Sequence, residues 1–236
     1  MAAKRSRLDR FISSKLRVKR GDVRLMLARG IVTVDGITAR DIHQQVNEFS
    51  TVVCDNTVLQ ENTARYLMLY KPAGVVSATK DLEHPTVMDL LGGESSSGLH
   101  IAGRLDLHST GLLLLTNNGE WSSALSLPQN NVEKIYRVEV AKPITDDYVT
   151  AFAAGMYFAY EDITTRPVTL RIVSEYVAEL RLVEGRYHQI KRMFGRFRNP
   201  VVSLHRVSIG PVCLDENLQP GESRELTDKE IHLTSF

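Results

Sequence analysis

The sequence predicts an α+β fold, with a small basic module of two helices and a hairpin followed by a larger domain built on a mostly antiparallel or mixed sheet. Three observations lead to this prediction. Residues 1–40 carry eleven Lys and Arg against three acids, whereas the rest of the 236-residue chain carries more acids than bases. Apolar residues near the N-terminus recur at helical spacing. Further along, segments with strand-like alternation are separated by irregular loops and few helices.

The basic module is expected over residues 1–57. Two apolar stripes predict its helices: Leu8, Phe11, Ile12 and Leu16 in the first, and Val23, Met26 and Leu27 in the second. Asp35-Gly36 is a hairpin turn signal. Arg20 and Arg24 lie one helical turn apart, so their guanidinium groups can bind a phosphate backbone together. The alternative is a disordered basic arm, and the regular apolar pattern argues against it.

The larger domain is expected over residues 64–236, after a linker at 56–64. Residues 112–115 are four consecutive leucines between turn signals, which predicts a short strand buried on both faces. Alternation predicts further strands at 66–69, 134–140 and 177–183, and residues 120–127 read as a short helix. A second helical stripe consists of Tyr187, Ile190, Phe194 and Phe197.

Composition limits the function classes. The two cysteines are far apart and indicate neither a disulfide framework nor a zinc site. No apolar stretch approaches the roughly 20 residues of a membrane span, and the basic N-terminus lacks the apolar core of a signal peptide. We therefore expect a cytoplasmic protein without a membrane partner. Nucleotide-binding and metal motifs are absent and the histidines are scattered, which argues against a nucleotide cofactor and against a metal-dependent nuclease.

Three groups of polar residues are candidates for chemistry. Asp106 lies in a polar loop that runs straight into the leucine strand, so its carboxylate is expected at the rim of a packed core; alternatively it only makes an Asx turn. Tyr136 shares an inward strand face with valines, where a simple core tyrosine is the alternative. His188, Lys191 and Arg192 share one face of the second stripe's helix, which is otherwise explained as a solvated basic surface.

Two resemblances follow from these residues. Segment Arg7-Leu8-Asp9-Arg10-Phe11-Ile12, the basic helix after it and Gly30-Ile31-Val32-Thr33-Val34-Asp35-Gly36 resemble the αL-type RNA-binding module of a small-subunit ribosomal protein and of many rRNA-modifying enzymes. This first resemblance implies structured RNA as a partner.

The larger domain resembles the rRNA pseudouridine synthases, and within them the small-subunit type. The segments that carry the resemblance are Lys71-Pro72-Ala73-Gly74, Gly103-Arg104-Leu105-Asp106 with Ser109-Thr110-Gly111-Leu112, Glu133-Lys134-Ile135-Tyr136, and Glu184-Gly185-Arg186-Tyr187-His188-Gln189-Ile190-Lys191-Arg192-Met193. Trp121 and His84-Pro85-Thr86-Val87 favour the small-subunit type. Tyr70 stands where the family often has asparagine.

The resemblance implies isomerisation of a uridine in 16S rRNA to pseudouridine, without cofactor or metal. It implies Asp106 as the catalytic carboxylate, by attack at C1′ or through an elimination across the sugar, Tyr136 as the active-site tyrosine and Lys191 as a basic partner of the aspartate. It places Arg104 at the extruded nucleotide. Ile190 or a neighbouring residue can supply an apolar wall for the uracil.

Arg186, His188, Arg192, Arg20 and Arg24 complete the expected RNA contacts. The expected partner is 16S rRNA, naked or in an assembly intermediate, and a monomer is expected. The alternatives are a synthase acting on 23S rRNA and a non-catalytic ribosome assembly or RNA-binding protein.

Overall fold

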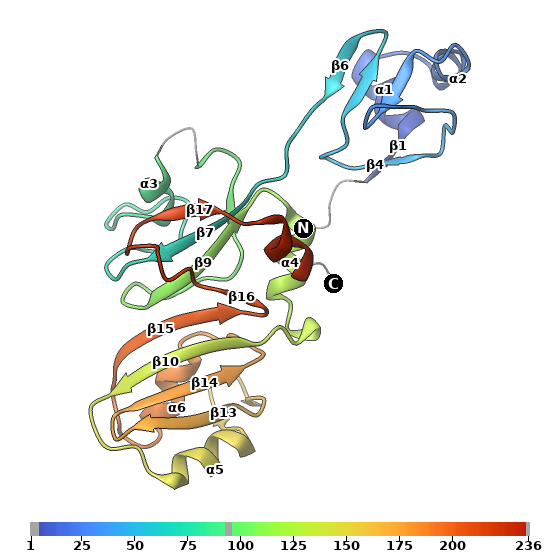
Figure 1. Cartoon of the computed structure of the whole chain (residues 1–236). Helices are drawn as coiled ribbons and strands as arrows, with labels where there is room; N and C mark the ends of the chain where they lie inside the picture. Colours follow the sequence, from blue (N-terminus) through green and yellow to red (C-terminus); the bar gives the residue numbers. More distant parts are fainter. Residues whose placement is uncertain (1–4, 93–95, 235–236) are drawn as a thin grey trace. The chain divides into compact units, whose positions relative to one another are not determined.

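The computed structural model describes residues 5–92 and 96–234, which fold as two compact units. The smaller unit comprises Met1–Ala64 with Asn118–Glu120, and the larger comprises Arg65–Asn117 with Trp121–Phe236. Figure 1 traces the chain from blue at the N-terminus to red at the C-terminus. Within the described residues, no helix is both long enough and apolar enough to cross a bilayer.

The smaller unit combines two helices with a four-stranded sheet of order β3-β2-β5-β6 and a short β1-β4 pair. Its elements are β1 (Ser6–Arg7), α1 (Leu8–Leu16), α2 (Arg20–Ala28), β2 (Val32–Val34), β3 (Ile37–Thr38), β4 (Gln45–Val46), β5 (Val52–Cys54) and β6 (Thr57–Gln60). The apolar stripes seen in the sequence form its core, since Leu8 and Ile12 of α1 and Val23 and Leu27 of α2 are all buried. The turn at Asp35-Gly36 joins β2 to β3, and both of its residues have positive φ.

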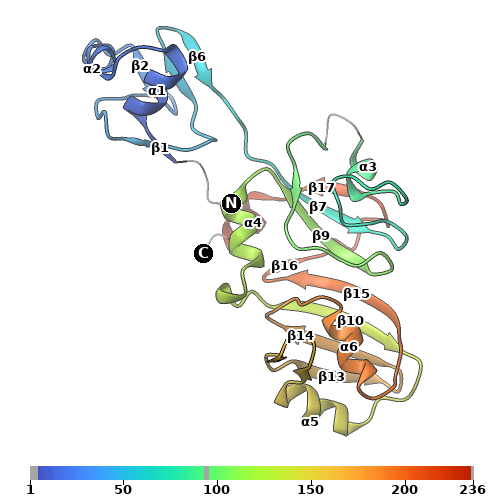
Figure 2. The ribbon, with the colours of Figure 1, turned by 180° about the vertical axis from the view of Figure 1, so that it is seen from behind.

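The larger unit is a long mixed sheet with helices on its faces (Figure 2). Its strands are β7 (Tyr66–Lys71), β8 (His100–Ile101), β9 (Thr110–Thr116), β10 (Lys134–Val140), β11 (Tyr157–Phe158), β12 (Ile163–Thr164), β13 (Thr169–Ser174), β14 (Val177–Leu182), β15 (Val201–Ile209), β16 (Val212–Cys213) and β17 (Ser223–Glu225). Its helices are α3 (Val87–Leu91), α4 (Gly119–Ser126, whose first two residues group with the smaller unit), α5 (Asp146–Ala154), α6 (Gln189–Gly195) and α7 (Asp228–Leu233), with a 3₁₀ turn at Pro128–Asn130.

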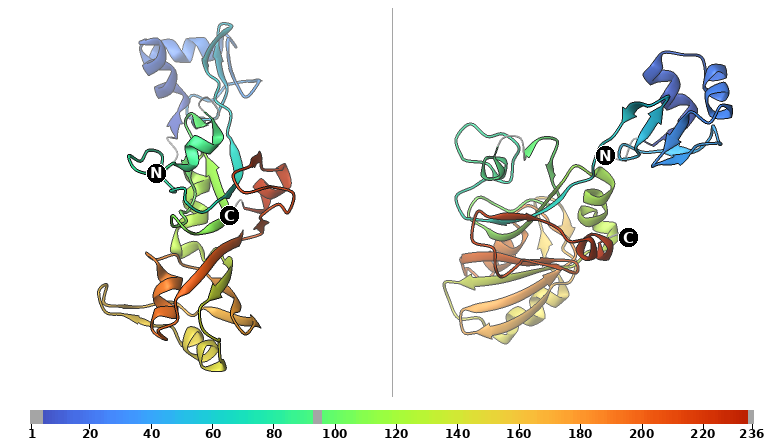
Figure 3. Two further views of the ribbon diagram at one scale, coloured as in Figure 1. Left: turned by 90° about the vertical axis from the view of Figure 1, so that its left-hand side faces the viewer. Right: turned by 45° about the horizontal axis from the view of Figure 1, so that its top comes forward.

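The strand order of the main sheet is β13-β14-β10-β15-β9-β7-β17 (Figure 1), and Figure 3 gives two further views of the ribbon. Every pairing along this path is antiparallel except that of β15 with β9, which is parallel. That parallel joint is short, because only His205 with Thr110 and Arg206 with Gly111 are in register. The two halves of the sheet therefore meet at the point where the loop carrying Asp106 enters β9.

The leucine strand is buried on both faces, as its sequence predicts. Leu113 and Leu115 join the core that also holds the apolar side chains of α5 and α6. Leu112 and Leu114 face the opposite way, into a second core with Trp121 of α4. The α+β fold class with its mixed sheet is thus confirmed, and so are the strand at 134–140 and the helix near 120–127.

One detail of the second stripe's helix is wrong. Tyr187 was expected among its buried apolar residues, yet α6 begins only at Gln189 and the Tyr187 side chain is 73% exposed. The reason is local, because His188 has a left-handed backbone conformation (φ 50°, ψ 30°) that separates Tyr187 from the helix. Ile190 and Phe194 are buried as expected, whereas Phe197 lies beyond the end of α6 at Gly195 and is half-buried.

Candidate active site

Asp106 lies in the loop between β8 and β9, at the rim of the core. The loop turns at Gly103, whose φ of +91° is rarely adopted by residues with a Cβ. Ser77 fixes the loop from the side: its Oγ donates to the Leu105 carbonyl (2.8 Å) and accepts from the Leu105 N–H (3.1 Å). The backbone of Leu105 is therefore held at both its N–H and its carbonyl, directly before the residue that carries the carboxylate.

Lys71, the last residue of β7, holds the same loop on the other side of Asp106. It is completely buried, and its ammonium donates to the carbonyls of Ser109 (2.8 Å), Leu107 (3.2 Å) and its own neighbour in sequence (2.8 Å). Burial lowers the pKa of Lys71 to about 8, while the charge of Asp106 opposes that shift. The sequence placed Lys71 in a motif but gave it no role. Its position now assigns it to supporting the Asp106 loop.

Arg206 of β15 binds both ends of the loop, and it is not among the residues expected from the sequence. Its guanidinium is buried and donates to the carbonyls of Gly103 (3.0 Å), Arg104 (3.4 Å) and Leu112 (2.8 Å). The signal that could have revealed it is its place in the strand: it lies two residues after the buried Leu204, on the same inward face. An arginine at an inward strand position needs acceptors inside the protein.

Two basic side chains face the Asp106 carboxylate. Lys191 Nζ lies 3.0 Å from Oδ2, and His188 Nε2 lies 3.5 Å from Oδ1. The Asp106 side chain keeps 30% of its surface exposed, so it can reach a ligand. The turn at this position is a backbone turn and not the Asx turn considered as the alternative, since the Ser109 N–H donates to the Asp106 backbone carbonyl (3.0 Å) while the carboxylate faces Lys191 and His188.

The segment that presents Lys191 is itself anchored. Glu184 is buried at its start and accepts hydrogen bonds from the Arg166 N–H and from Gln189 Nε2, both at 2.8 Å. Gln189 in turn accepts from the Arg186 N–H (3.0 Å). These bonds fix the approach to α6, so that Lys191 on its first turn faces the aspartate.

The three side chains expected to be catalytic line one cavity of about 90 Å³: Asp106, Tyr136 and Lys191. Ile190 supplies an apolar wall there, and Arg104 lies at the edge. The Tyr136 ring is buried on the inward face of β10, as its alternation predicted, and its hydroxyl lies 3.4 Å from Arg206 Nη1. One acid, one ammonium and one phenol thus surround a space the size of a single ring.

The expected RNA contacts divide into two groups within the larger unit. Arg186 and His188 line the same cavity as Asp106. Arg192 instead points to the β11–β12 hairpin, where it forms a bidentate ion pair with Glu161 (2.6 and 2.7 Å) and stacks on Phe158 at 3.7 Å. Its contact with RNA stays a prediction.

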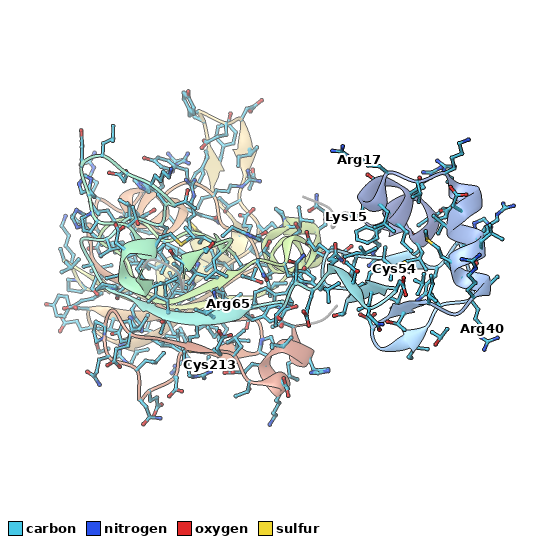
Figure 4. All side chains as sticks on the ribbon, turned by 90° about the horizontal axis from the view of Figure 1, so that it is seen from above. Lys15, Arg17, Arg40, Cys54, Arg65 and Cys213 are labelled. Atoms are coloured by element: carbon cyan, nitrogen blue, oxygen red, sulfur yellow. The ribbon has the colours of Figure 1, made fainter. Side chains whose placement is uncertain are left out.

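In the smaller unit, Arg20 and Arg24 are exposed on α2, one turn apart. Arg24 also borders a cavity of about 460 Å³ together with Arg29 and Arg40. Figure 4 shows Arg17 and Arg40 extending from the surface of this unit. The arrangement can attract a polyanion, and the role of each arginine stays a prediction.

Comparison with known proteins places these features in a group. Residues 65–195 match the family described as RNA pseudouridylate synthase. A curated relative from Pseudomonas aeruginosa, "Ribosomal small subunit pseudouridine synthase A", is 49% identical over 95% of this chain and 98% of its own length. The protein of that name from Escherichia coli is 41% identical over 95% of this chain and 98% of its own length. A solved structure described as "Crystal structure of pseudouridylate synthase" aligns over 100% of both chains with a TM-score of 0.71 and 35% identity.

Proposed function

The chain belongs to the RNA pseudouridylate synthase family, and from that premise we propose that it converts one uridine of 16S rRNA to pseudouridine, with Asp106 as the catalytic carboxylate. The observation that carries the proposal is the single cavity shared by Asp106, Tyr136 and Lys191. Three side chains from three separate segments converge on a space that one pyrimidine can occupy.

The reaction explains why these residue types are needed. The N1–C1′ bond of the uridine breaks, the uracil turns, and a new C5–C1′ bond forms. The proton leaves C5, N1 ends the reaction protonated, and the overall composition is unchanged. A carboxylate beside the ribose can attack C1′ or assist loss of the base by elimination across the sugar. Asp106 is held for such a role by the hydrogen bonds of Lys71 and Arg206 to its loop.

Tyr136 and Lys191 take complementary roles around that carboxylate. The Tyr136 ring offers a face on which the detached uracil can lie, and its hydroxyl can move a proton. The Lys191 ammonium, 3.0 Å from the carboxylate, orients it and balances its charge. Ile190 provides the apolar wall that holds the base while it turns.

The choice of 16S rRNA is supported by the names of the curated relatives and by the small-subunit features of the sequence. RNA of any kind requires cationic contacts, and the exposed arginines of α2 supply them. We further propose that the protein works as a monomer in the cytoplasm, where it meets rRNA or an assembly intermediate of the small subunit.

The test is tritium release from 16S rRNA labelled at C5 of uridine. Asp106→Asn should release none, because the amide cannot replace the carboxylate, and should still bind the RNA. Asp146→Asn, an exposed aspartate at the start of α5, serves as the matched control and should match the unsubstituted protein. Continued turnover in Asp106→Asn would remove Asp106 from the mechanism.

Mapping the pseudouridines of both rRNAs in a strain with and without this protein tests the target. Loss of a single 16S position supports the proposal. Loss of a 23S position instead would move the same chemistry to the large subunit.

A further inference from the structure

A second, larger cavity lies beside the one that holds the catalytic groups. Its volume is about 430 Å³, and Asp106, Arg104 and His188 line both spaces. The rest of its lining mixes apolar side chains, among them Val76, Ala78 and Leu107, with polar ones such as Ser77 and Asp81. The mechanism above uses only the smaller cavity, so the larger one has no assigned occupant.

Tyr187 forms the exposed wall of this second cavity. Its side chain is 73% exposed, and its ring is stacked on that of His188, with centroids 3.9 Å apart and planes 17° apart. The His188 imidazole is held in turn by its left-handed backbone and by its approach to Asp106. A tyrosine ring with one face backed and the other toward solvent is prepared to stack on a further flat group.

Size separates what the two cavities can hold. A cavity of about 150 Å³ accommodates one benzene molecule, so the 90 Å³ space admits at most a single ring. The 430 Å³ space has room for a base together with its sugar and phosphate. Because Asp106 lines both cavities, they are close enough for two adjoining nucleotides of one chain to enter them together.

Charge in the second cavity suits a nucleotide as well. Arg104 and Arg186 are exposed on its wall and can meet a phosphate. The one additional acid, Asp81, already accepts hydrogen bonds from the N–H groups of Glu83 and His84, both at 2.9 Å. The Asp81 carboxylate is therefore engaged by the backbone N–H groups of its own turn.

We propose that the second cavity binds a nucleotide adjoining the target uridine, with its base stacked on the Tyr187–His188 pair and its phosphate at Arg104 and Arg186. The inference rests on the proposed function in one respect, namely that the adjoining base in the smaller cavity is the target uracil. When the target base leaves the stack, the flanking base loses a stacking partner. The exposed aromatic ring at Tyr187 can replace that partner. The site thus favours a single-stranded or opened RNA segment over a lone nucleotide.

The first experiment measures stacking without any turnover. In Tyr187→Trp, the new indole should be quenched by a single-stranded uridine trinucleotide and much less by UMP, which has no adjoining nucleotide to place in the larger cavity. Trp121 is the only natural tryptophan and is buried, so its emission gives a constant background. Tyr160→Trp is the matched control, because Tyr160 is 96% exposed but lines neither cavity. Equal quenching by UMP and the trinucleotide, or no quenching by either, would overturn the proposal.

The second experiment measures kcat/KM for tritium release from 16S rRNA. Tyr187→Ala should lose about fivefold to a hundredfold, the range expected for one base–aromatic stack. Tyr187→Phe should stay within about twofold of the unsubstituted protein, as should Tyr160→Ala, because stacking needs the ring and not the hydroxyl. An unchanged kcat/KM in Tyr187→Ala contradicts the inference.

The two proposals fail in different ways. If the trinucleotide quenches Tyr187→Trp but neither the unsubstituted protein nor any variant releases tritium, the proposed reaction is rejected and the nucleotide site is kept. Tritium release with no trinucleotide quenching would keep the reaction and reject the site.

Discussion

The substitution Gly111→Ala adds a single methyl group at the point where the two halves of the main sheet meet, and we expect it to push them apart. Gly111 pairs with Arg206 in the short parallel joint between β9 and β15, and its φ is +105°. A Cβ at this position would lie 2.3 Å from the Arg206 carbonyl oxygen and 2.7 Å from the Arg206 nitrogen. Both atoms are backbone, so neither can rotate away, and β15 itself must shift.

The cost of Gly111→Ala has two parts. Holding a residue with a Cβ at positive φ costs about 1–2 kcal/mol. Forcing extra volume into a packed site costs about 1–3 kcal/mol more. The lower entropy of the unfolded alanine chain returns about 0.4–1 kcal/mol. We therefore expect the free energy of unfolding to fall by about 3 kcal/mol, which lowers the thermal midpoint by roughly 6–12 °C for a unit of this size.

The control variant, Gly221→Ala, separates the cost of a positive φ from the cost of the steric clash with β15. Gly221 has a similar φ of +95°, but a Cβ there would have no atom within 4 Å. Urea unfolding followed by the emission of the buried Trp121 should therefore show a loss in Gly111→Ala that is larger by about 2 kcal/mol than that in Gly221→Ala. If the two variants lose the same amount, the close approach of β15 to Gly111 is not a stabilising constraint and the reasoning fails.

Three further predictions concern the groups around the site. Arg206→Lys keeps the charge but cannot reach all three carbonyls, so kcat for tritium release should fall at least about tenfold with the RNA Kd unchanged; a fall in affinity alone would contradict this. The pKa of Lys71 is about 8 in the folded protein and 10.5 in the unfolded chain, so between these pH values only the unfolded state keeps the proton. The free energy of unfolding should therefore rise from pH 8 to 10.5, relative to that of Lys71→Met, by up to about 3 kcal/mol. Urea titrations at several pH values measure this difference, and parallel profiles for the two proteins would refute the prediction. Replacing Arg20 and Arg24 together with glutamine should reduce the salt dependence of RNA binding by about one unit of slope per lost phosphate contact, measured by filter binding between low and high salt, and an unchanged slope would remove them from the interface.

Much of this architecture was predictable because its signals are local. The apolar stripe of α1, the turn between β2 and β3 and the inward position of Tyr136 each follow from residues close together in the chain. The leucine strand could be predicted for the same reason, since four apolar residues bounded by turns leave no face for water.

The parts that escaped prediction depend on contacts between distant segments. Arg206 acts on carbonyls roughly a hundred residues earlier in the chain, and its inward place on the strand predicts burial but not which carbonyls it meets. Lys71 was visible as part of a motif, but its role requires knowing that β7 ends beneath the loop of Asp106. Tyr187 was misassigned because periodicity alone cannot detect a left-handed residue at position 188.

Among the described residues, each unit has hydrophobic core residues of its own. Leu59 packs with the core of the smaller unit and Leu67 with a core of the larger one, whereas the described residues 61–64 contribute to neither. A junction placed within residues 61–64 would therefore divide the chain without cutting through any of the described hydrophobic cores.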